Sequence, residues 1–284
     1  MKNSAILLLA CPDRKGLVAT ISDFVFRHNG NIIHANEHAD EQSNLFLMRV
    51  EFDPSGFDIP LAEFQKHFAS IAEKYEMNWR LAQSSRRPKM AILVSKYDHC
   101  LVDLLYRHKS GELECEIPII ISNHSDNEPI ADFYKIPYVT VPVLKENKQE
   151  AEQKKLTLLR QHQPDFIVLA RYMQILPAQF LNEYPQRIIN IHHSVLPAFV
   201  GAKPYHQAFE RGVKLIGATS HYVTEVLDDG PIIEQDVVRI SHSDSLDDLL
   251  RKGRDLEKVV LSRAVRWHIE SRILVYGNKT VVFT

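Results

Sequence analysis

The sequence lacks the features that mark membrane proteins, nucleic-acid-binding proteins and disulfide-stabilised domains. No apolar run approaches the roughly 20 residues that a membrane-spanning helix needs. The formal net charge is -2, without the basic excess that usually accompanies nucleic-acid binding. The cysteines, Cys11, Cys100 and Cys115, form no CxxC pair, so we expect free thiols in a reducing compartment. These absences favour a cytoplasmic protein that acts on a small molecule.

Chain length and composition fit two ordinary globular domains. The 284 residues compare with a prior of ~150 residues per domain, and a hydrophobic fraction of 45% leaves enough apolar side chains for two cores. The apolar run Ala5 to Ala10 is too short for a signal peptide and predicts a strand. A polar run with a proline, residues 83–89, is typical of a connector. We expect domains at residues 1–84 and 89–284, joined by a linker at 85–88.

The first domain alternates between strand and helix patterns. Apolar residues follow strand, helix, strand, strand, helix and strand periodicity in turn, over residues 5–10, 17–25, 32–40, 45–52, 61–75 and 78–82. In the fourth of these segments the apolar side chains alternate, which predicts a strand buried on one face only. The order βαββαβ predicts a ferredoxin-like sheet with two helices on one face.

The second domain has the pattern of a mainly parallel α/β sheet. Short β-branched runs are separated by helical segments, and several are apolar at every position, as strands covered on both faces should be. These runs occupy residues 90–94, 117–122, 138–141, 166–170, 188–191, 214–223 and 232–240. A long helical segment begins near Leu246, and a hairpin around Gly277-Asn278 ends the chain.

The loop after the first strand suggests a regulatory ligand site. The segment CPDRKGLVATI and the later HNGNI resemble the ACT domain, a module that binds amino acids. A helix N-terminus there would accept a carboxylate, and Asp13 would take an ammonium. Alternatively, Asp13 caps the helix and Gly16 turns the chain, and the module only pairs subunits through its sheet, which gives a homo-oligomer. The expected effector residues are Asp13, Gly16, Leu17, Asn29, Gly30 and Asn31.

Polar side chains at the ends of apolar strands indicate the main site. Asn190 and His192 lie two apart in a strand and therefore share a face. An amide and a protonated imidazole can together stabilise a tetrahedral oxyanion. A second strand-like run ends at His221, close to Asp228. Such groups at strand ends predict a site rather than a core.

Three ordered motifs around these residues carry a family resemblance. NIHHSVLP at residues 190–197, GATSHYV at 217–223 and DDGPIIEQ at 228–235 resemble the formyltransferase family that uses 10-formyltetrahydrofolate. By this resemblance Asp228 is the essential carboxylate, which raises the pKa of His192 and orients or deprotonates an attacking water. His221 is either structural or chemical, and His193 points the opposite way, as packing or support.

The same resemblance places the folate. A pterin needs an apolar slot with a few placed polar groups, and the family positions that match are RYMQIL at residues 171–176 and the segment 222–230. Two of the apolar residues there, Met173 and Leu176, could instead belong to the core. The expected folate-binding residues are Met173, Gln174, Leu176, Tyr222, Val223 and Gly230.

One departure from the family bears on the reaction. Members that formylate glycinamide ribonucleotide carry a glycine-rich loop after the first strand of this domain, where it holds a phosphate. The corresponding stretch here, VSKYDHCLVDLL at residues 94–105, has no glycine and contains Asp98. Water is then the expected acceptor of the formyl group. An ACT-like domain ahead of the catalytic domain most resembles the hydrolase branch of the family. By this resemblance the products are formate, for purine synthesis, and tetrahydrofolate, for the one-carbon pool. A formyltransferase to an unphosphorylated amine is the alternative.

Three other kinds of protein are alternatives to this interpretation: a metal-dependent hydrolase, a formyltransferase that acts on a transfer RNA, and a non-catalytic sensor. His192, His193, His221 and Asp228 are competent zinc ligands, but neighbouring strand residues point to opposite faces, so we expect no metal and no dissociable cofactor. A formyltransferase acting on a transfer RNA is disfavoured because the C-terminal tail has no basic extension. A non-catalytic amino-acid sensor would leave Asn190, His192 and Asp228 without a role. If there is an effector, methionine or glycine is expected.

Overall fold

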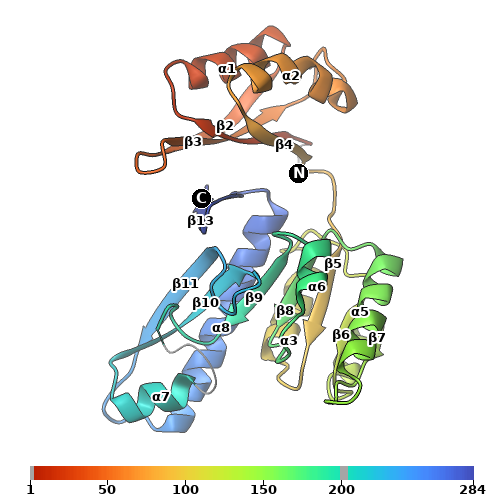
Figure 1. Ribbon diagram of the computed structural model, residues 1–284, viewed down its shortest axis with the longest axis vertical. Helices are drawn as coiled ribbons and strands as arrows, with labels where there is room; N and C mark the ends of the chain where they lie inside the picture. Colours follow the sequence, from red (N-terminus) through yellow and green to blue (C-terminus); the bar gives the residue numbers. More distant parts are fainter. Residues whose placement is uncertain (1–2, 199–203) are drawn as a thin grey trace. The chain divides into compact units, whose positions relative to one another are not determined.

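The computed structural model describes residues 3–198 and 204–284 and divides into two compact units (Figure 1). Unit 1 contains the chain up to Arg87 together with the segments Glu270–Tyr276 and Thr280–Thr284. Unit 2 contains Pro88–Ile269 and the short turn Gly277–Lys279. The expected second domain, residues 89–284, is therefore shortened at its C-terminal end, because the terminal hairpin packs with unit 1.

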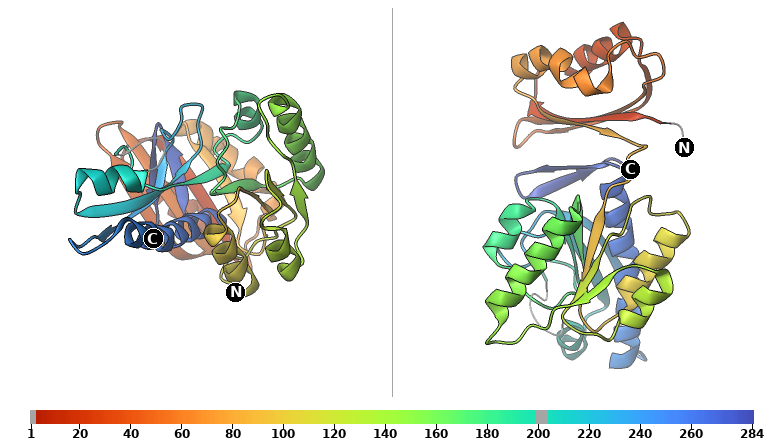
Figure 2. Two further views of the ribbon diagram at one scale, coloured as in Figure 1. Left: turned by 90° about the horizontal axis from the view of Figure 1, so that it is seen from below. Right: turned by 90° about the vertical axis from the view of Figure 1, so that its right-hand side faces the viewer.

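Unit 1 has the expected βαββαβ order. Its four strands form an antiparallel sheet in the order β2-β3-β1-β4, and both helices cover one face (Figures 1 and 2). This is the ferredoxin-like arrangement. The elements are β1 (Ala5–Pro12), α1 (Leu17–Arg27), β2 (Asn31–Asp40), β3 (Leu45–Asp53), a 3-10 turn η1 (Leu61–Glu63), α2 (Phe64–Lys74) and β4 (Asn78–Gln83).

The second face of this sheet is also covered. Strands β12 (Ile273–Tyr276) and β13 (Lys279–Val282) form a two-stranded sheet, and Phe283 packs with Ile6, Leu8 and Leu47 on the face away from the helices. Strand β3 is consequently buried on both faces rather than on one. The polar Arg49 in β3 is buried too, and its Nε donates to the carbonyl of Ser271 at 3.0 Å.

Unit 2 contains a seven-stranded sheet in the order β11-β10-β9-β8-β5-β6-β7. The strands from β9 to β7 in that order are parallel, and β10 and β11 are antiparallel additions at one edge. The strands are β5 (Met90–Val94), β6 (Ile120–Ser122), β7 (Tyr138–Thr140), β8 (Phe166–Ala170), β9 (Ile188–His192), β10 (Leu215–Tyr222) and β11 (Ile232–Arg239). The sequence pattern predicted each of these strands to within a few residues.

Helices cover both faces of this sheet, as the all-apolar strands predicted. On one face, α5 and α6 pack on β5 and β8 through a shared apolar core, and on the other α3 packs against α8 (Figure 2). The helices are α3 (His99–Lys109), α4 (Glu128–Tyr134), α5 (Lys148–His162), α6 (Ala178–Glu183), α7 (Pro204–Arg211) and α8 (Leu246–Ile269). Over the described ranges, every helix is too short or too polar to cross a bilayer.

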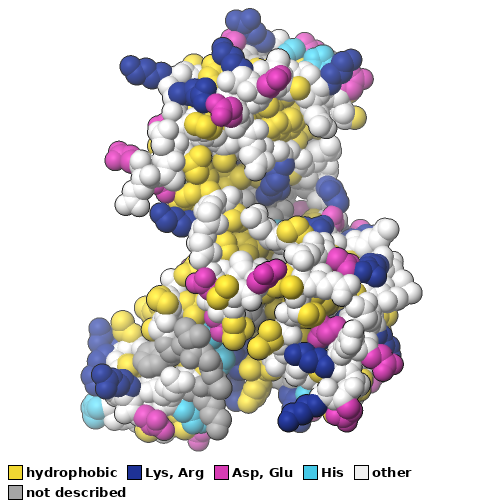
Figure 3. Space-filling model, in the orientation of Figure 1, with side chains coloured by type: hydrophobic (Ala, Val, Ile, Leu, Met, Phe, Trp, Pro, Cys, Tyr) yellow, Lys and Arg dark blue, Asp and Glu magenta, His cyan; other side chains and the backbone are white. Residues whose placement is uncertain are grey.

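Charged side chains are mixed on both units. On the face drawn in Figure 3, lysine and arginine side chains alternate with aspartate and glutamate over each unit instead of gathering in one basic patch.

Candidate active site

Four polar side chains meet where β9 and β10 lie side by side. Antiparallel pairing sets His221 of β10 opposite Asn190 of β9, and the Nδ2 of Asn190 lies 3.2 Å from the Nε2 of His221. Asp228, in the loop after β10, places Oδ2 3.2 Å from the Nδ1 of His192 and Oδ1 3.8 Å from the Nε2 of His221. The structure thus brings together an amide, two imidazoles and one carboxylate.

The loop that carries Asp228 is shaped by its backbone. Asp228 itself has a positive φ of 56°, which a short polar side chain tolerates better than most residues. Two residues later, a Cβ on Gly230 would stand 1.7 Å from the carbonyl oxygen of Tyr222, so this position admits glycine alone. Gly230 lets the loop return closely against β10 and so sets the position of Asp228, and its expected contact with folate stays a prediction.

His192 has one nitrogen engaged and one unused. Its Nδ1 pairs with Asp228, while Nε2 is buried and has no hydrogen-bond partner within the described part of the chain. An orphaned buried nitrogen carries an energetic cost. Burial raises the pKa of Asp228, but the hydrogen bond and charge of His192 outweigh burial and leave this pKa below its ordinary value. Asp228 is therefore ionised at neutral pH, and the Nε2 of His192 is left without a partner among the described residues.

His221 orients Asn190. Burial lowers the pKa of His221 despite the nearby carboxylate, so the ring is neutral. Its Nδ1 lies 3.0 Å from the carbonyl oxygen of Tyr222 and must donate there, which makes Nε2 an acceptor. Nε2 then accepts from one N–H of Asn190. The second N–H of the amide is left for a ligand oxygen, and this favours the structural alternative for His221.

His193 lies beside this group without joining it. Its ring centroid is 5.2 Å from that of His192 and 5.9 Å from that of Tyr205. Burial, assisted by the charge of Arg171, lowers the pKa of His193 to about 3. A neutral, half-buried ring between His192 and Tyr205 fits the expected packing role.

The expected folate positions fall into two sets. Leu176 and Tyr222 are buried, Leu176 in the core under α6 and Tyr222 with its hydroxyl 2.8 Å from the Nδ1 of His268. Tyr222 faces away because it is adjacent to His221 in a strand. Met173 is 54% exposed and available to a ligand, while Gln174 and Val223 are partly exposed. Three further exposed apolar residues, Ile175, Val226 and Leu227, lie within the predicted segments 171–176 and 222–230 but were not among the individually expected folate-binding residues.

The expected effector residues lie at both ends of α1. Asp13, Gly16 and Leu17 are at its N-terminal end, and Asn29, Gly30 and Asn31 follow its C-terminal end. The helix has 11 residues and is therefore about 17 Å long. Gly16 has a φ of 90° and Asn29 donates to the carbonyl of Gly56 at 2.9 Å, so each end has a local structural role. One copy of unit 1 does not bring the two sets together.

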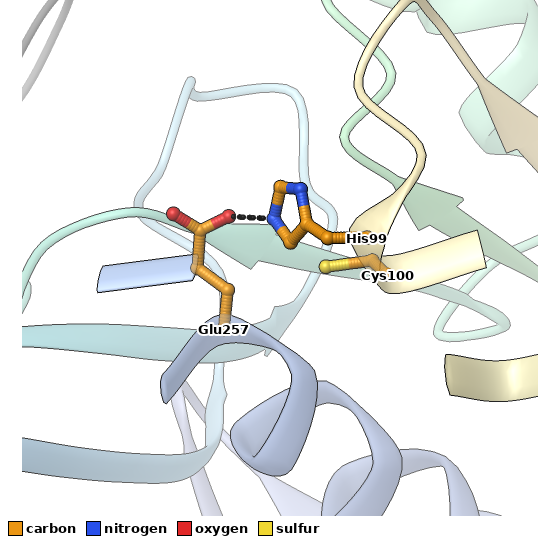
Figure 4. Close-up of side chains that lie close together, drawn as sticks. All are labelled: His99, Cys100 and Glu257. Carbon is orange, nitrogen blue, oxygen red and sulfur yellow. Dashed lines mark hydrogen bonds and ion pairs between the residues drawn. The ribbon is translucent and has the colours of Figure 1, made fainter. Parts of the chain in front are cut away.

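A buried polar cluster that sequence reasoning missed lies around Glu257 of α8. Its carboxylate lies 2.7 Å from the Nε2 of His99 (Figure 4). It also accepts from the hydroxyl of Tyr205 at 2.8 Å and pairs with the Nε of Arg171 at 3.4 Å. These four residues are called the Glu257 cluster below. A charged residue on the apolar face of α8, four residues after Gly253, is the sequence signal that could have revealed it.

Cys100 lies beside this cluster, and its sulfur, with the ligand atoms of His99 and Glu257, forms a group within 4.8 Å (Figure 4). The chemistry of these donors does not fit a metal ion. Burial and the charge of Glu257 raise the pKa of the Cys100 thiol well above its usual value, whereas a metal needs the thiolate. In addition, both carboxylate oxygens already have partners, and Arg171 adds a positive charge at the same place.

Comparison with known proteins agrees with this arrangement. Residues 88–265 match the family model described as formyl transferase. A formyltetrahydrofolate deformylase from Synechocystis is 55% identical over 99% of this chain and 98% of its own length. A crystal structure of a formyltetrahydrofolate deformylase from Pseudomonas syringae superposes with a TM-score of 0.98, at 51% identity, over 100% of this chain and 95% of that one.

The fold of unit 2 is shared more widely. A glycinamide ribonucleotide transformylase from Symbiobacterium toebii matches 72% of this chain and 98% of its own, with a TM-score of 0.67 and 27% identity. The full-length matches at about half identity are, in contrast, to deformylases. The chain belongs to the formyltransferase family and, within it, to the formyltetrahydrofolate deformylases.

Proposed function

We propose that this protein hydrolyses 10-formyltetrahydrofolate to tetrahydrofolate and formate, acting in the cytoplasm without a metal or dissociable cofactor. The observation that carries the mechanism is the state of His192, whose Nδ1 is held by Asp228 while its buried Nε2 has no partner in the described ranges. A hydrolase needs such a preorganised donor at the reacting carbonyl. The reaction returns tetrahydrofolate to the one-carbon pool and supplies formate for purine biosynthesis.

Asn190 and His192 bind the formyl oxygen as it becomes negative. The donors are the N–H of Asn190 that is not donated to His221 and the Nε2–H of His192, which has no partner among the described residues. Because these donors are fixed by β9 and by their own partners, they need no reorganisation when the tetrahedral intermediate forms. Removing one such donor commonly lowers turnover by ~10²-fold or more.

Asp228 positions the attacking water. The water oxygen forms a bond to the formyl carbon and gives one proton to the carboxylate as the carbonyl becomes an oxyanion. The C–N10 bond then breaks, N10 takes a proton from His192, and formic acid ionises in solution. The proton held by Asp228 passes to His192 and restores the starting state. Since the pKa of Asp228 is lowered, orienting the water is its larger contribution.

The folate lies against the loops after β8 and β10. Met173 and Ile175 on one loop and Val226 and Leu227 on the other are exposed apolar side chains, and Val226 and Leu227 directly precede Asp228. They supply the apolar walls that a pterin requires. Gln174 and Val223 complete this slot, while Leu176, Tyr222 and Gly230 support the loops from behind.

Unit 1 is proposed to bind an amino-acid effector, methionine or glycine, in a homo-oligomer. Strand β2 is an edge strand of ten residues, nearly all of them exposed. Unpaired edges of this length favour pairing with another chain. Because Asp13 and Asn29 lie at opposite ends of α1, an effector site that uses both sets of residues would need a second copy.

The test is formate release from 10-formyltetrahydrofolate in the absence of any amine. The proposal predicts one formate and one tetrahydrofolate per substrate, unaffected by a chelator. Turnover that begins only after an amine is added would identify a transferase instead. Repeating the assay with methionine and with glycine, alongside Asp13→Ala, shows whether unit 1 responds to either amino acid.

A further inference from the structure

The Glu257 cluster fills the place where an open parallel sheet usually binds its ligand. Such a crevice lies outside the carboxyl ends of the strands, where the strand order reverses. In unit 2 this point is between β5 and β8, since the chain runs from β5 out to β6 and β7 and then returns to β8 and β9 on the other side. His99 follows β5, and Glu257 reaches it from α8 (Figure 4). Arg171 follows β8 and pairs with the same carboxylate.

The cluster is buried and held together by ion pairs and hydrogen bonds to Glu257, although the Nε of Arg171 makes only the 3.4 Å ion pair and no hydrogen bond among the described residues. The Glu257 side chain is 1% exposed and that of Arg171 10%. Burial raises the pKa of Glu257, but the hydrogen bond from His99 and the charge of Arg171 outweigh it, so this pKa is lowered and the carboxylate is ionised. Buried ion pairs seldom add net stability over a well-packed apolar alternative. Their presence at the crevice suggests a role in the reaction rather than in folding.

Helix α8 is adapted to hold Tyr205 in this place. A Cβ on Gly253 would stand 2.2 Å from the Cζ and 2.4 Å from the hydroxyl oxygen of Tyr205. Glycine inside a helix costs up to about 1 kcal/mol relative to alanine, yet its absence of a side chain lets the tyrosine ring lie directly on the helix. Residues 253 and 257 share a helix face, so the ring that covers Gly253 delivers its hydroxyl to Glu257.

The cluster adjoins the reacting group. Leu169 of β8 pairs with Asn190 of β9, and Arg171 follows the end of β8. The charges of Arg171 and Glu257 both act on the pKa of His193, the neighbour of His192. On the far side of His192, the His193 ring contacts Tyr205. A nucleophile larger than water, attached to its own carbon skeleton, would have to extend from the formyl carbon across these strand ends. The Glu257 cluster occupies that route.

We propose that the Glu257 cluster, with the Tyr205 ring as its wall, determines acceptor specificity by excluding amines, so that water alone reaches the formyl carbon. The inference rests on the proposed hydrolysis. A glycinamide ribonucleotide transformylase has the same fold, so the fold alone does not choose between transfer and hydrolysis. When an amine is admitted, its nitrogen bonds to the formyl carbon, the C–N10 bond breaks, and one amine proton is lost while N10 gains one.

The test measures two products from 10-formyltetrahydrofolate in the presence of glycinamide, a small primary amine. The wild-type protein should give formate without N-formylglycinamide at every glycinamide concentration. Tyr205→Ala should raise the ratio of N-formylglycinamide to formate to at least ~10-fold above the limit of detection in the wild-type assay. A change of this size is what the loss of one steric contact commonly produces. Tyr205→Phe, which keeps the ring and removes the hydroxyl alone, is the matched control and should still give formate.

Two further variants guard against a folding defect in Tyr205→Ala. His99→Ala truncates a partly exposed side chain, and Gly253→Ala displaces the tyrosine ring without removing it. At least one folded variant, judged by its thermal unfolding, should form N-formylglycinamide. If the folded variants release formate but form no N-formylglycinamide, the inference about acceptor specificity is wrong, while the proposed hydrolysis still stands. Absence of formate from the wild-type protein would instead remove the proposed function.

Discussion

The Nδ1 of His192 lies 3.2 Å from the Oδ2 of Asp228, and the opposite nitrogen of the same ring is buried without a partner within the described ranges. The carboxylate holds the ring through Nδ1, and the proposed mechanism uses Nε2 as the donor to the substrate. A carboxylate, an imidazole and an amide then surround one small volume, which is what hydrolysis of a formyl group requires.

Asn190 and His221 should act as one unit. Asn190→Ala is expected to lower kcat by ~10²-fold or more because an oxyanion donor is lost. His221→Ala should cost less, since it removes the acceptor that orients the amide. Because His221 acts through Asn190, the double variant should be no slower than Asn190→Ala alone. Additive losses, measured by steady-state kinetics on all three proteins, would show that His221 has its own contact with the substrate.

Asp228→Asn should lower kcat by ~10²- to 10⁴-fold with little change in thermal stability, as the substitution keeps the side-chain size. Since the pKa of Asp228 lies below its usual value of ~3.9, the carboxylate is ionised at higher pH. A pH–rate profile of the wild-type protein should therefore show no acid limb from Asp228 above about pH 4. An Asp228→Asn protein with near-normal kcat would contradict the role given to the carboxylate.

His193 should make the protein less stable in mild acid. Its pKa is about 3 in the folded protein and ~6.5 when unfolded, so the unfolded chain binds the extra proton first. Stability is fully present above about pH 6.5 and falls toward pH 3, by up to ~1.4 kcal/mol per pH unit for one such group. Denaturant unfolding at pH 7.5 and 5.5 (chosen as roughly one unit either side of the free-histidine pKa) should show a smaller loss in His193→Gln. An equal loss in both proteins would assign the effect to other groups.

The C-terminal hairpin should stabilise unit 1. Phe283 is 6% exposed and packs on Ile6, Leu8 and Leu47, so Phe283→Ala is expected to cost ~3–5 kcal/mol. Thr284→Ala, at the exposed neighbouring position, is the matched control and should be neutral. Native-state hydrogen exchange in β1 and β3 would locate the loss in unit 1, and unchanged protection there would contradict the packing role.

The sequence predicted the strands and helices well because their signals are local. Apolar residues with a period of 2 predicted β3, apolar residues with a period of 3.6 predicted α8, and an all-apolar run predicted β8. The two-sided burial of β3 was not predictable, since the covering side chain, Phe283, comes from the far end of the chain.

In the candidate site, too, the features that depend on local spacing were predictable, and those that depend on distant contacts were not. Asn190 and His192 share a strand, so their common face was readable from spacing, and the family motifs added Asp228. The neutral state of His221 depends on a carbonyl of its own neighbour, which spacing does not reveal. The Glu257 cluster unites side chains from four separate segments, and only the tertiary fold brings them into contact.

The most direct measurement is hydrolysis of 10-formyltetrahydrofolate in water enriched in heavy oxygen, with no amine present, by the wild-type protein and by His192→Ala. The mechanism predicts one solvent oxygen in each formate and a fall in turnover of ~10²-fold or more in the variant, with thermal unfolding unchanged. Formate without solvent oxygen, or a folded His192→Ala protein that turns over within a few-fold of wild type, would contradict it.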